Sequence, residues 1–332
     1  ASDVYKRQHL MKTEYEYILE VFKTGSFSKA AQNLFITQPA LSIAIKKIEK
    51  DIHMPLFDRS HKPLTLTPAG KIFITNILQM KELENNLTRS IQDLDNLESG
   101  ELRLAGTQYL NSHVIPAAID QYIAAHPKVS LSLLEENSGK LNDLLKYGLV
   151  DMVLHCGEYD SSKYRGIPFF RDHLFLAVPR KYISAPPLLE KSYCAEELLK
   201  DDFLTNPKPK VPLEYFSNVP FLLLTNTNNL RVRALAICHE NQFTPNIRFQ
   251  AEQLETAYYL AAHGLGATFI SDVMIREHHF PNLVFYPIDS PVAVRIYHAV
   301  IHKHSYLSRH METFIDLARK TWKGKSNYCI DD

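Results

Sequence analysis

The sequence has little cysteine, and the cysteines that it has are scattered. Its 332 residues include four, at positions 156, 194, 238 and 329, and no two of them stand close together. Structural zinc sites and thioredoxin-type redox pairs need cysteines a few residues apart, so neither can be predicted from this spacing. We expect reduced thiols with structural roles.

Long apolar runs are also missing. No window approaches the roughly 18 consecutive apolar residues of a membrane-spanning helix, and nothing marks a signal peptide. The composition, 45% hydrophobic and 22% charged, is typical of a globular protein, for which we expect a cytoplasmic location. The length exceeds one ordinary core and predicts two or three domains. Residues 1–10, before Met11, show no apolar period and are interpreted as a leader outside the fold.

The usual motifs of catalysis are absent from the sequence. It contains no G-x-S-x-G elbow, no P-loop and no H-E-x-x-H. The adjacent Glu135 and Glu136 would point to opposite faces of a strand and cannot work as a pair. His298, His302 and His304 could share one strand face, but their spacing is not a zinc pattern. We therefore expect neither an enzyme nor a resident metal or cofactor.

The net charge is zero, because 37 basic side chains balance 37 acidic ones. A balanced total argues neither for nor against nucleic acid, but the distribution is uneven. Between Val21 and Lys71, eight Lys and Arg residues stand against three Asp and Glu residues. This local excess is a modest electrostatic footprint for phosphate.

The same region has the apolar period of short helices. Apolar residues recur over positions 15–22, the pattern breaks at Gly25, and it resumes over 27–34. Gly25 is suited to the left-handed end of the first helix, and Ser28 is the expected N-cap of the second. The pattern predicts helix, turn and helix.

A third helix is expected after Thr37, which would cap it, with Pro39 in the first turn, where a missing N–H costs nothing. Its buried stripe would be Ala40, Leu41, Ala44, Ile45 and Ile48. Its outer face would carry Gln38, Ser42, Ile43, Lys46 and Lys47. Glutamine and serine can bond base edges, isoleucine can touch a thymine methyl, and lysines can pair with phosphates. A three-helix domain with a solvated polar face is the alternative.

A short hairpin is expected next. The stretch MPLFDRSHKPLTLTPAG alternates around Leu64 and Leu66 between turn residues, and would carry Arg59, His61 and Lys62 at its tip. An arginine on such a wing can enter a narrow minor groove, whose negative potential attracts it.

The run from Met11 to Gly70 resembles the winged helix-turn-helix of LysR-type transcriptional regulators. The segments GSFSKAAQNLFITQPALSIAIKKIE and PLFDRSHKPLTLTPAG carry the resemblance over about forty positions without a gap. At positions 43 and 44 the family often has a polar or basic residue and a glutamine, whereas this chain has Ile and Ala, so the operator sequence does not follow. The resemblance implies base contacts by Gln38, Pro39 and Ser42, phosphate contacts by Lys29, Thr37 and Lys46, and a wing containing Arg59 and Lys62.

Residues 68–97 predict one long helix with a single apolar seam. The seam recurs at spacings of three and four, at Phe73, Ile77, Met80, Leu83, Leu87, Ile91, Leu94 and Leu97. Such a stripe favours a partner helix over the chain's own domains. In LysR-type regulators this segment is the linker helix that dimerises, which implies contacts by Ile77, Met80, Leu83, Leu87, Ile91 and Leu94. Two heads on one dimer would require an operator of approximate dyad symmetry.

After Gly100 the pattern changes to alternating strands and helices. The first set has expected strands over 101–106, 129–135 and 150–154, and helices over 110–125 and 138–147. The second set has expected strands over 221–224, 246–250 and 266–270, and helices over 229–241 and 253–263. Strand, helix and strand in this order predict parallel pairing with right-handed crossovers.

The segment between the two sets, 173–212, contains six prolines and is expected to form loops and connections. Two late strand-like stretches and a helix around 307–321 are expected to return to the first set. The result would be two lobes joined by crossing segments near 176–180 and 269–272. Lobe I would cover about 100–175 and 271–322, and lobe II about 176–270.

Two such lobes form a cleft at the strand ends, where helix N-termini present free N–H groups to anions. Small polar residues gather at the expected turns: Thr107, Gln108, Asn111, Ser112, Asn137, Ser138, Thr225, Asn226, Thr227 and Asn228. We expect them to grip a carboxylate or similar group, although helix capping alone explains any single one. The stretches LEENSGKLNDLLKYGLVDMVL and AEQLETAYYLAAHGLGATFIS resemble the effector-binding domain of LysR-type regulators, a relative of type 2 periplasmic binding proteins.

The sequence thus predicts a multidomain α plus α/β protein. The expected organisation is a leader over 1–10, a winged helix-turn-helix domain over 11–70, a linker helix over 71–99, a two-lobed α/β effector domain over 100–322 and a tail over 323–332. The resemblance implies a regulator that binds double-stranded DNA as a dimer or tetramer, contacts RNA polymerase and responds to a small molecule.

Two alternatives stay open. A cytoplasmic solute-binding protein of the periplasmic type explains the lobes but leaves residues 11–97 without a role. A helical head that binds protein leaves the basic excess and Arg59 unexplained. Salt-dependent binding to duplex DNA separates both from a regulator.

Overall fold

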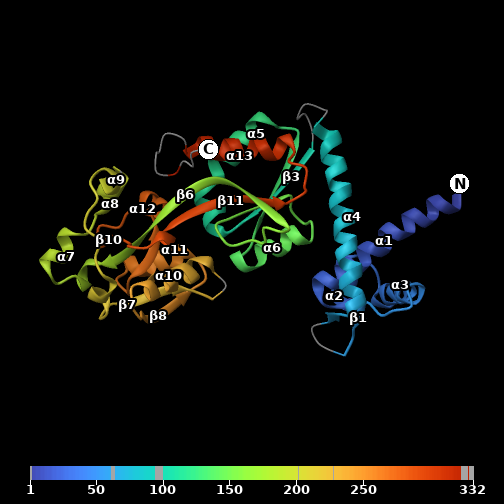
Figure 1. The fold of residues 1–332 in the computed structure, drawn as a ribbon, viewed down its shortest axis with the longest axis horizontal. Coiled ribbons are helices and arrows are strands. Elements are labelled where there is room, and N and C mark those ends of the chain that lie inside the picture. Colours follow the sequence, from blue (N-terminus) through green and yellow to red (C-terminus); the bar gives the residue numbers. More distant parts are fainter. Residues whose placement is uncertain are drawn as a thin grey trace. The chain divides into compact units, whose positions relative to one another are not determined.

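The computed structural model describes residues 2–60, 64–93, 100–200, 202–226, 228–322 and Tyr328. The chain divides into two compact units, residues 1–87 and 88–332, and each is described by itself (Figure 1). Several residues singled out in the sequence lie outside the described ranges: His61, Lys62, Leu94, Leu97, Thr227 and Cys329. Within those ranges, no helix has the length and apolar character needed to cross a membrane.

The first unit contains helices and a small two-stranded wing. Its elements are α1 (Ser2–Thr24), α2 (Phe27–Asn33), α3 (Gln38–Asp51), β1 (Phe57–Asp58), β2 (Thr65–Leu66) and most of α4 (Pro68–Gln92). The wing strands are antiparallel, with Phe57 opposite Leu66. Because α1 begins at Ser2, regular structure extends into the segment that the sequence had suggested to be a leader outside the fold.

The helix ends follow the local sequence, with one correction. Gly25 has a φ of +60°, the left-handed conformation expected at the end of α1. Ser26, and not the expected Ser28, caps α2: its side chain accepts from the Lys29 N–H at 3.4 Å. The chain turns at once after Gly25, so Ser28 already lies inside the helix. Thr37 caps α3 as expected, accepting from the Ala40 N–H at 3.3 Å.

The core of the first unit forms where α1, α2, α3 and the start of α4 meet. Of the stripe expected on α3, Leu41, Ile45 and Ile48 are buried and Ala44 is half-buried. Ala40 is exposed, contrary to the prediction, because it lies in the first turn, where no other element covers the helix. The remaining buried residues of this core are Ile18, Leu19, Val21, Ala30, Ala31, Leu56, Phe57, Ile74 and Ile77.

The second unit begins with a five-stranded arrangement in the order β4-β3-β5-β11-β6. As predicted, β3 (Gly100–Gly106) runs parallel to β4 (Val129–Glu135) and β5 (Met152–His155). β11 (Val294–His302) lies antiparallel between β5 and β6 (Tyr164–Pro179). In Figure 1, α5 (Pro116–Ala125) and α13 (Arg309–Trp322) lie together over one face, while α6 (Ser138–Lys146) covers the other.

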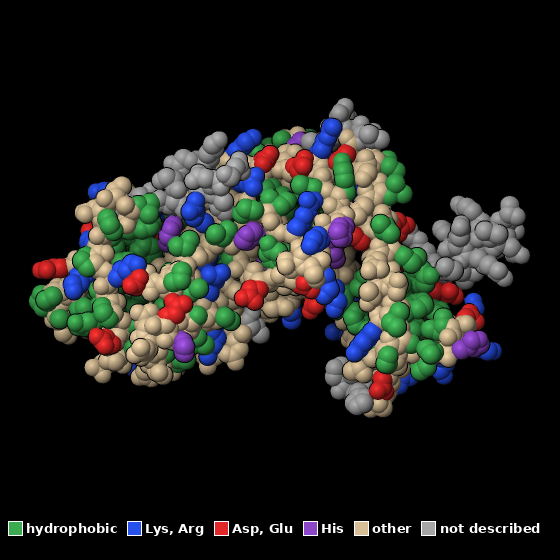
Figure 2. All heavy atoms as spheres, viewed as in Figure 1, with side chains coloured by type: hydrophobic (Ala, Val, Ile, Leu, Met, Phe, Trp, Pro, Cys, Tyr) green, Lys and Arg blue, Asp and Glu red, His purple; other side chains and the backbone are tan. Residues whose placement is uncertain are grey.

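A second group of strands uses the other half of β6. There β6 pairs antiparallel with β9 (Thr268–Ser271) and β10 (Leu283–Pro287), while β7 (Pro220–Leu224) pairs parallel with β8 (Asn246–Ala251). The helices of this part are α7 (Pro186–Glu190), α8 (Ala195–Leu199), α9 (Asp202–Thr205), α10 (Asn229–Glu240), α11 (Leu254–Ala262) and α12 (Asp272–Glu277). Charged side chains of both signs are interspersed over the visible face of the second unit (Figure 2).

Strand β6 corrects the predicted connections. The segment expected to be loops begins with residues 173–179, which form the buried second half of this 16-residue strand. Its prolines start only at Pro179, where the strand ends. The first crossing between the sheets lies where β6 changes partners, between His173 and Leu174, and not near 176–180.

The second crossing lies between β10 and β11, around 288–293, and not near 269–272. Of the late elements, β11 and α13 return to the first set of strands as expected, whereas β10 stays with the second because it pairs with residues 175–179. The strand that the sequence concealed therefore determines where one lobe ends and the other begins.

Candidate nucleic-acid interface and effector cleft

The outer face of α3 presents the side chains that the sequence singled out for DNA. Gln38, Pro39, Lys46 and Lys47 are exposed, and Ser42 is half-buried. Ile43 is 69% exposed, an unusual position for a large apolar side chain unless it meets a partner. Thr37 and Lys29 are exposed nearby, at the starts of α3 and α2. The structure therefore brings the expected set together on one side of the helix-turn-helix.

Arg59 follows β1 but folds back on the head. Its guanidinium lies 3.2 Å from Glu49 Oε2 and over the Phe27 ring at 4.7 Å. The other oxygen of Glu49 accepts from the Leu56 N–H at 2.8 Å, so this residue of α3 also fixes the start of the wing. Sequence reasoning missed Glu49. An exposed ion pair contributes little stability, so Arg59 can exchange this carboxylate for a phosphate at small cost.

The later part of α4 carries an apolar seam without a cover. Met80, Leu83, Leu87 and Ile91 are 51%, 69%, 62% and 58% exposed, at spacings of three, four and four. Ile77 corrects the prediction: it is 5% exposed and belongs to the core of the head, because it shares the helix face of Ile74. The seam open to a partner therefore starts at Met80.

The end of α4 belongs to the second unit and is anchored there. Arg89 donates to Asp151 at 2.6 Å and to Ser305 at 3.0 Å. Asp151 also accepts from the Arg103 guanidinium at 2.6 Å. Burial by itself would raise the pKa of Asp151, but the two guanidinium groups hold it below its ordinary value. Asp93 then accepts from the Arg309 N–H at 3.0 Å, at the start of α13.

A cleft between the two groups of strands contains an inner and an outer pocket. The inner pocket has a volume of about 40 Å³ and the outer one about 250 Å³. Thr107, Ser138, Asn228 and Gln253 line both, so the two are continuous. These residues follow β3, β4, β7 and β8, at the strand ends where ligands bind in open α/β sheets.

The predicted ligand residues divide into three groups. Thr107, Gln108, Asn137, Ser138 and Asn228 line the cleft. Asn111, Ser112, Thr225 and Asn226 line neither pocket, and Thr227 lies outside the described residues. The local hydrogen bonds of Asn111 and Thr225 explain their placement: the Asn111 amide donates to the Leu134 carbonyl and the Thr225 hydroxyl to Glu252.

Other lining residues were not predicted: Tyr109, Glu135, Glu136, His155, Cys156, Leu224, Asn229, Leu230, Glu252, Gln253, Leu254, Arg295 and Tyr297. Most of them follow the same rule of strand ends, which the sequence analysis applied to β3, β4 and β7 but not to β5 and β8. His155 ends β5 and Glu252 follows β8. Of the histidines noted in the sequence, His298 and His302 lie on β11, and the described residues contain no metal-binding cluster.

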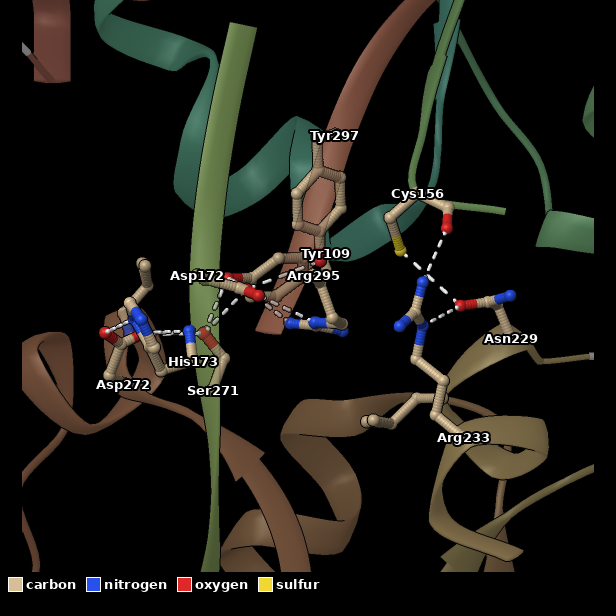
Figure 3. A network of polar contacts seen from close by, with 12 residues as sticks. Tyr109, Cys156, Asp172, His173, Asn229, Arg233, Ser271, Asp272, Arg295 and Tyr297 are labelled. Carbon is tan, nitrogen blue, oxygen red and sulfur yellow. Dashed lines mark hydrogen bonds and ion pairs between the residues drawn. The ribbon is translucent and has the colours of Figure 1, made fainter. Parts of the chain in front are cut away.

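The floor of the inner pocket is a buried ionic network where β6 passes between the sheets (Figure 3). Asp172 is fully buried directly opposite Arg295 in the ladder, and the Arg295 Nε donates to it at 2.8 Å. The Tyr109 hydroxyl at 2.6 Å and the Ser271 hydroxyl at 2.9 Å donate to the same carboxylate. Burial, together with Asp172, raises the pKa of Tyr109, so its hydroxyl stays protonated. The network connects β3, β6, β9 and β11.

Beside this floor, the inner pocket has donors without an opposing carboxylate. His155 is 3% exposed, and its Nδ1 accepts from the Gly157 N–H at 3.0 Å, so Nε2 carries the ring hydrogen. Burial, and secondly His298, lowers the pKa of His155 to about 4, which keeps the ring neutral. Its Nε2 has no partner among the described residues.

Arg233 reaches the same pocket from α10. It donates to Asn229 Oδ1 at 2.9 Å and to the Cys156 carbonyl at 3.0 Å (Figure 3). No carboxylate of the described residues lies within ion-pair distance of it. Burial raises the pKa of the Cys156 thiol, so this cysteine is protonated and unreactive.

Comparison with known proteins identifies both units. Residues 13–71 match the family model of the bacterial regulatory helix-turn-helix proteins of the lysR family, and residues 95–323 match the LysR substrate binding domain. The uncharacterized HTH-type transcriptional regulator YcgK of Bacillus subtilis is 31% identical over 310 residues, which cover 93% of this chain and 94% of the relative. A probable RuBisCO transcriptional regulator of Gracilaria tenuistipitata is 25% identical over 301 residues, 89% of this chain and 91% of the relative.

Solved structures share the fold. Full-length OxyR of Pseudomonas aeruginosa superimposes with a TM-score of 0.64 at 22% identity, over 92% of this chain and 94% of OxyR. Full-length CbnR complexed with its target DNA gives a TM-score of 0.55 at 16% identity, over 93% and 99% of the two chains. With both family models matched in order over nearly the whole sequence, the chain belongs to the LysR family of DNA-binding transcriptional regulators.

Proposed function

We propose that the outer face of α3 enters the major groove of an operator. Gln38, Pro39 and Ser42 would face the bases, with Ile43 against a thymine methyl. The phosphate contacts would come from Lys29, Thr37, Lys46 and Lys47, and the wing would add Arg59 and Lys62. The observation that carries this proposal is the joint exposure of these polar and basic side chains on one face of the helix-turn-helix. A site on duplex DNA also supports a cytoplasmic location.

The regulator would act as a dimer through α4. Met80, Leu83, Leu87 and Ile91 form a row of large apolar side chains, each more than half exposed, which a second α4 would cover. Leu94, the next position in the row, would extend the contact. Two heads on one dimer require two half-sites with approximate dyad symmetry. Association of two such dimers into a tetramer would lengthen the protected DNA.

A small molecule in the cleft would control the heads. We take the effector domain to cover 100–322, with the lobes divided at 173–174 and 288–293, behind a winged domain over 11–70 and a linker over 71–99. A ligand acts only through its different affinity for two arrangements of the lobes. The anchors of Arg89 and Asp93 on the second unit give such a change a route to α4 and so to contact with RNA polymerase.

A gel shift and footprint on the DNA directly upstream of the chain's own gene, at two salt concentrations, tests the proposal. We expect a protected dyad and an affinity that falls steeply with salt, with a logarithmic slope of about −0.9 for each phosphate neutralised. Failure to protect any DNA at low salt would contradict it and would favour a solute-binding protein. Thr107→Val should remove the response to ligand while the operator is still bound.

A further inference from the structure

The outer pocket is lined by hydrogen-bond acceptors and negative charge. Three carboxylates line it, those of Glu135, Glu136 and Glu252, and no Lys, Arg or His does so among the described residues. Glu136 has the exposed Lys140 at 3.8 Å, and Glu252 accepts from the Thr225 hydroxyl at 3.2 Å. Neither contact neutralises the group as a whole. A purely anionic molecule would therefore be repelled here.

Two amide oxygens at the same place lack donors. Asn137 Oδ1 and Gln108 Oε1 are buried atoms without a hydrogen-bond partner among the described residues. Asn137 immediately precedes α6, yet its side chain makes no capping bond. Buried acceptors without donors cost stability, so their persistence favours a donor supplied from outside the chain. A protonated amine offers three N–H donors and the charge that the carboxylates require.

The inner pocket has the opposite polarity. The unpartnered Nε2–H of His155 is a donor in a side chain that is 97% buried, and Arg233 is a cation without a carboxylate nearby. The start of α10, with its partial positive charge, lies at Asn228 and Asn229, both in the lining. Arg295 adds no net charge, because Asp172 balances it. The group that fits here is an acceptor with negative charge.

The sizes of the two pockets agree with this division. The inner volume of about 40 Å³ compares with the roughly 10–15 Å³ that a single water needs, so it takes a group of a few heavy atoms. A carboxylate has that size. The outer pocket, at about 250 Å³, holds the rest of a small molecule.

We infer that the effector is a small zwitterion, an amino acid or a close analogue, with its carboxylate in the inner pocket at His155 and its ammonium group among Glu135, Glu136 and Glu252 of the outer pocket. The inference rests on the proposed function only in naming this molecule the effector; the binding site itself is argued from the cleft. It refines the expectation of a simple carboxylate, which would leave the acidic outer pocket without a counter-charge.

Calorimetry and thermal unfolding of the full-length protein test the inference. The probes are the common L-amino acids and the linear ω-amino acids from β-alanine to ε-aminohexanoate. Each is paired with its deaminated acid and its decarboxylated amine, for example γ-aminobutyrate with butanoate and propylamine. We expect at least one amino acid to bind about tenfold or more tighter than both of its analogues, since each analogue lacks one charge-assisted contact. Absence of binding by every amino acid, or equal binding of the deaminated acid, would overturn the inference.

Variants locate the two ends of the ligand. The triple change Glu135→Gln, Glu136→Gln and Glu252→Gln should weaken the amino acid about tenfold and leave its deaminated acid unaffected or tighter. His155→Leu should weaken both molecules alike, and His155→Gln, which keeps an N–H donor, should restore part of the loss. Glu214→Gln, at an exposed glutamate outside both pockets, is the matched control and should bind as the original protein does. Unchanged binding in the triple variant would refute the placement of the ammonium group.

The DNA assay separates this inference from the proposed function. A protected operator together with no amino acid bound would overturn the inference and leave the regulator intact. An amino acid bound without any operator protection would support the site and contradict the regulator.

Discussion

The head and the second unit hold their functional side chains in different ways. On α3 the side chains offered to DNA lie within residues 38–47 and are mostly exposed. The cleft is instead built from residues 107–297, and its floor is fully buried. A surface formed by one helix depends on local sequence, whereas a cleft depends on strands that are far apart in the chain. Changes in the head should therefore alter binding, and changes in the cleft floor should alter stability first.

The largest effect is expected from Asp172→Ala. It leaves Arg295 buried without its counter-charge, and losing one partner of a buried pair costs about 3–5 kcal/mol. Chemical denaturation, followed by a signal from the second unit, measures the loss. A double variant with Asp172→Leu and Arg295→Met should recover much of it. A loss below about 1 kcal/mol in the single variant would show that the floor is not held by this pair.

The next effect concerns the exposed seam of α4, a feature of neither site. Leu87→Lys places a charge in the middle of the contact, and we expect dimer dissociation to rise by about 100-fold. Sedimentation equilibrium measures it. Glu84→Lys also adds a positive charge to α4 and serves as a control for charge alone. An unchanged dimer in the Leu87 variant would place the self-association elsewhere.

Acid should weaken the cleft more than the head. The pKa of His155 is lowered to about 4 in the folded chain, so the unfolded chain takes up its proton first as the pH falls. Its contribution is fully present above about pH 6.5 and is lost between there and about pH 4. We expect His155→Gln to make unfolding less pH-dependent over this window, by about 1–2 kcal/mol. Parallel pH curves for the two proteins would contradict a neutral buried imidazole.

The smallest effects should come from single contacts in the head. Arg59→Ala should weaken binding to all sequences by about 1 kcal/mol and lower the salt slope by about one. Ser42→Ala should instead change the preference among operator variants. Fluorescence anisotropy on a set of single-base substitutions distinguishes the two. Equal losses on every sequence for both variants would remove the distinction between phosphate and base contacts.

The sequence predicted local features best. Strand β4 has the predicted bounds, and Gly25 and Thr37 take the predicted turn and cap, because each depends on neighbouring residues. Strand β6 was missed, since a strand buried on both faces lacks the polar alternation that marks a half-exposed one. Its proline-rich continuation hid it further.

The site shows the same limit. Thr107 and Ser138 were found because they follow predicted strands, whereas nothing local connects Asp172 with Arg295, more than a hundred positions apart. Asn111 has the residue type of a ligand contact but spends its amide on the Leu134 carbonyl. The DNA contact of Lys62 and the dimer contact of Leu94 stay predictions.

The most direct test of the regulator is a footprint on the DNA upstream of its own gene, with the original protein and Leu87→Lys compared at equal concentration and at two salt concentrations. We expect two protected half-sites related by a dyad for the original protein, weaker at the higher salt, and loss of the paired protection in the variant. Protection that is absent at low salt, or identical for the two proteins, would contradict a dimer that reads DNA through two heads.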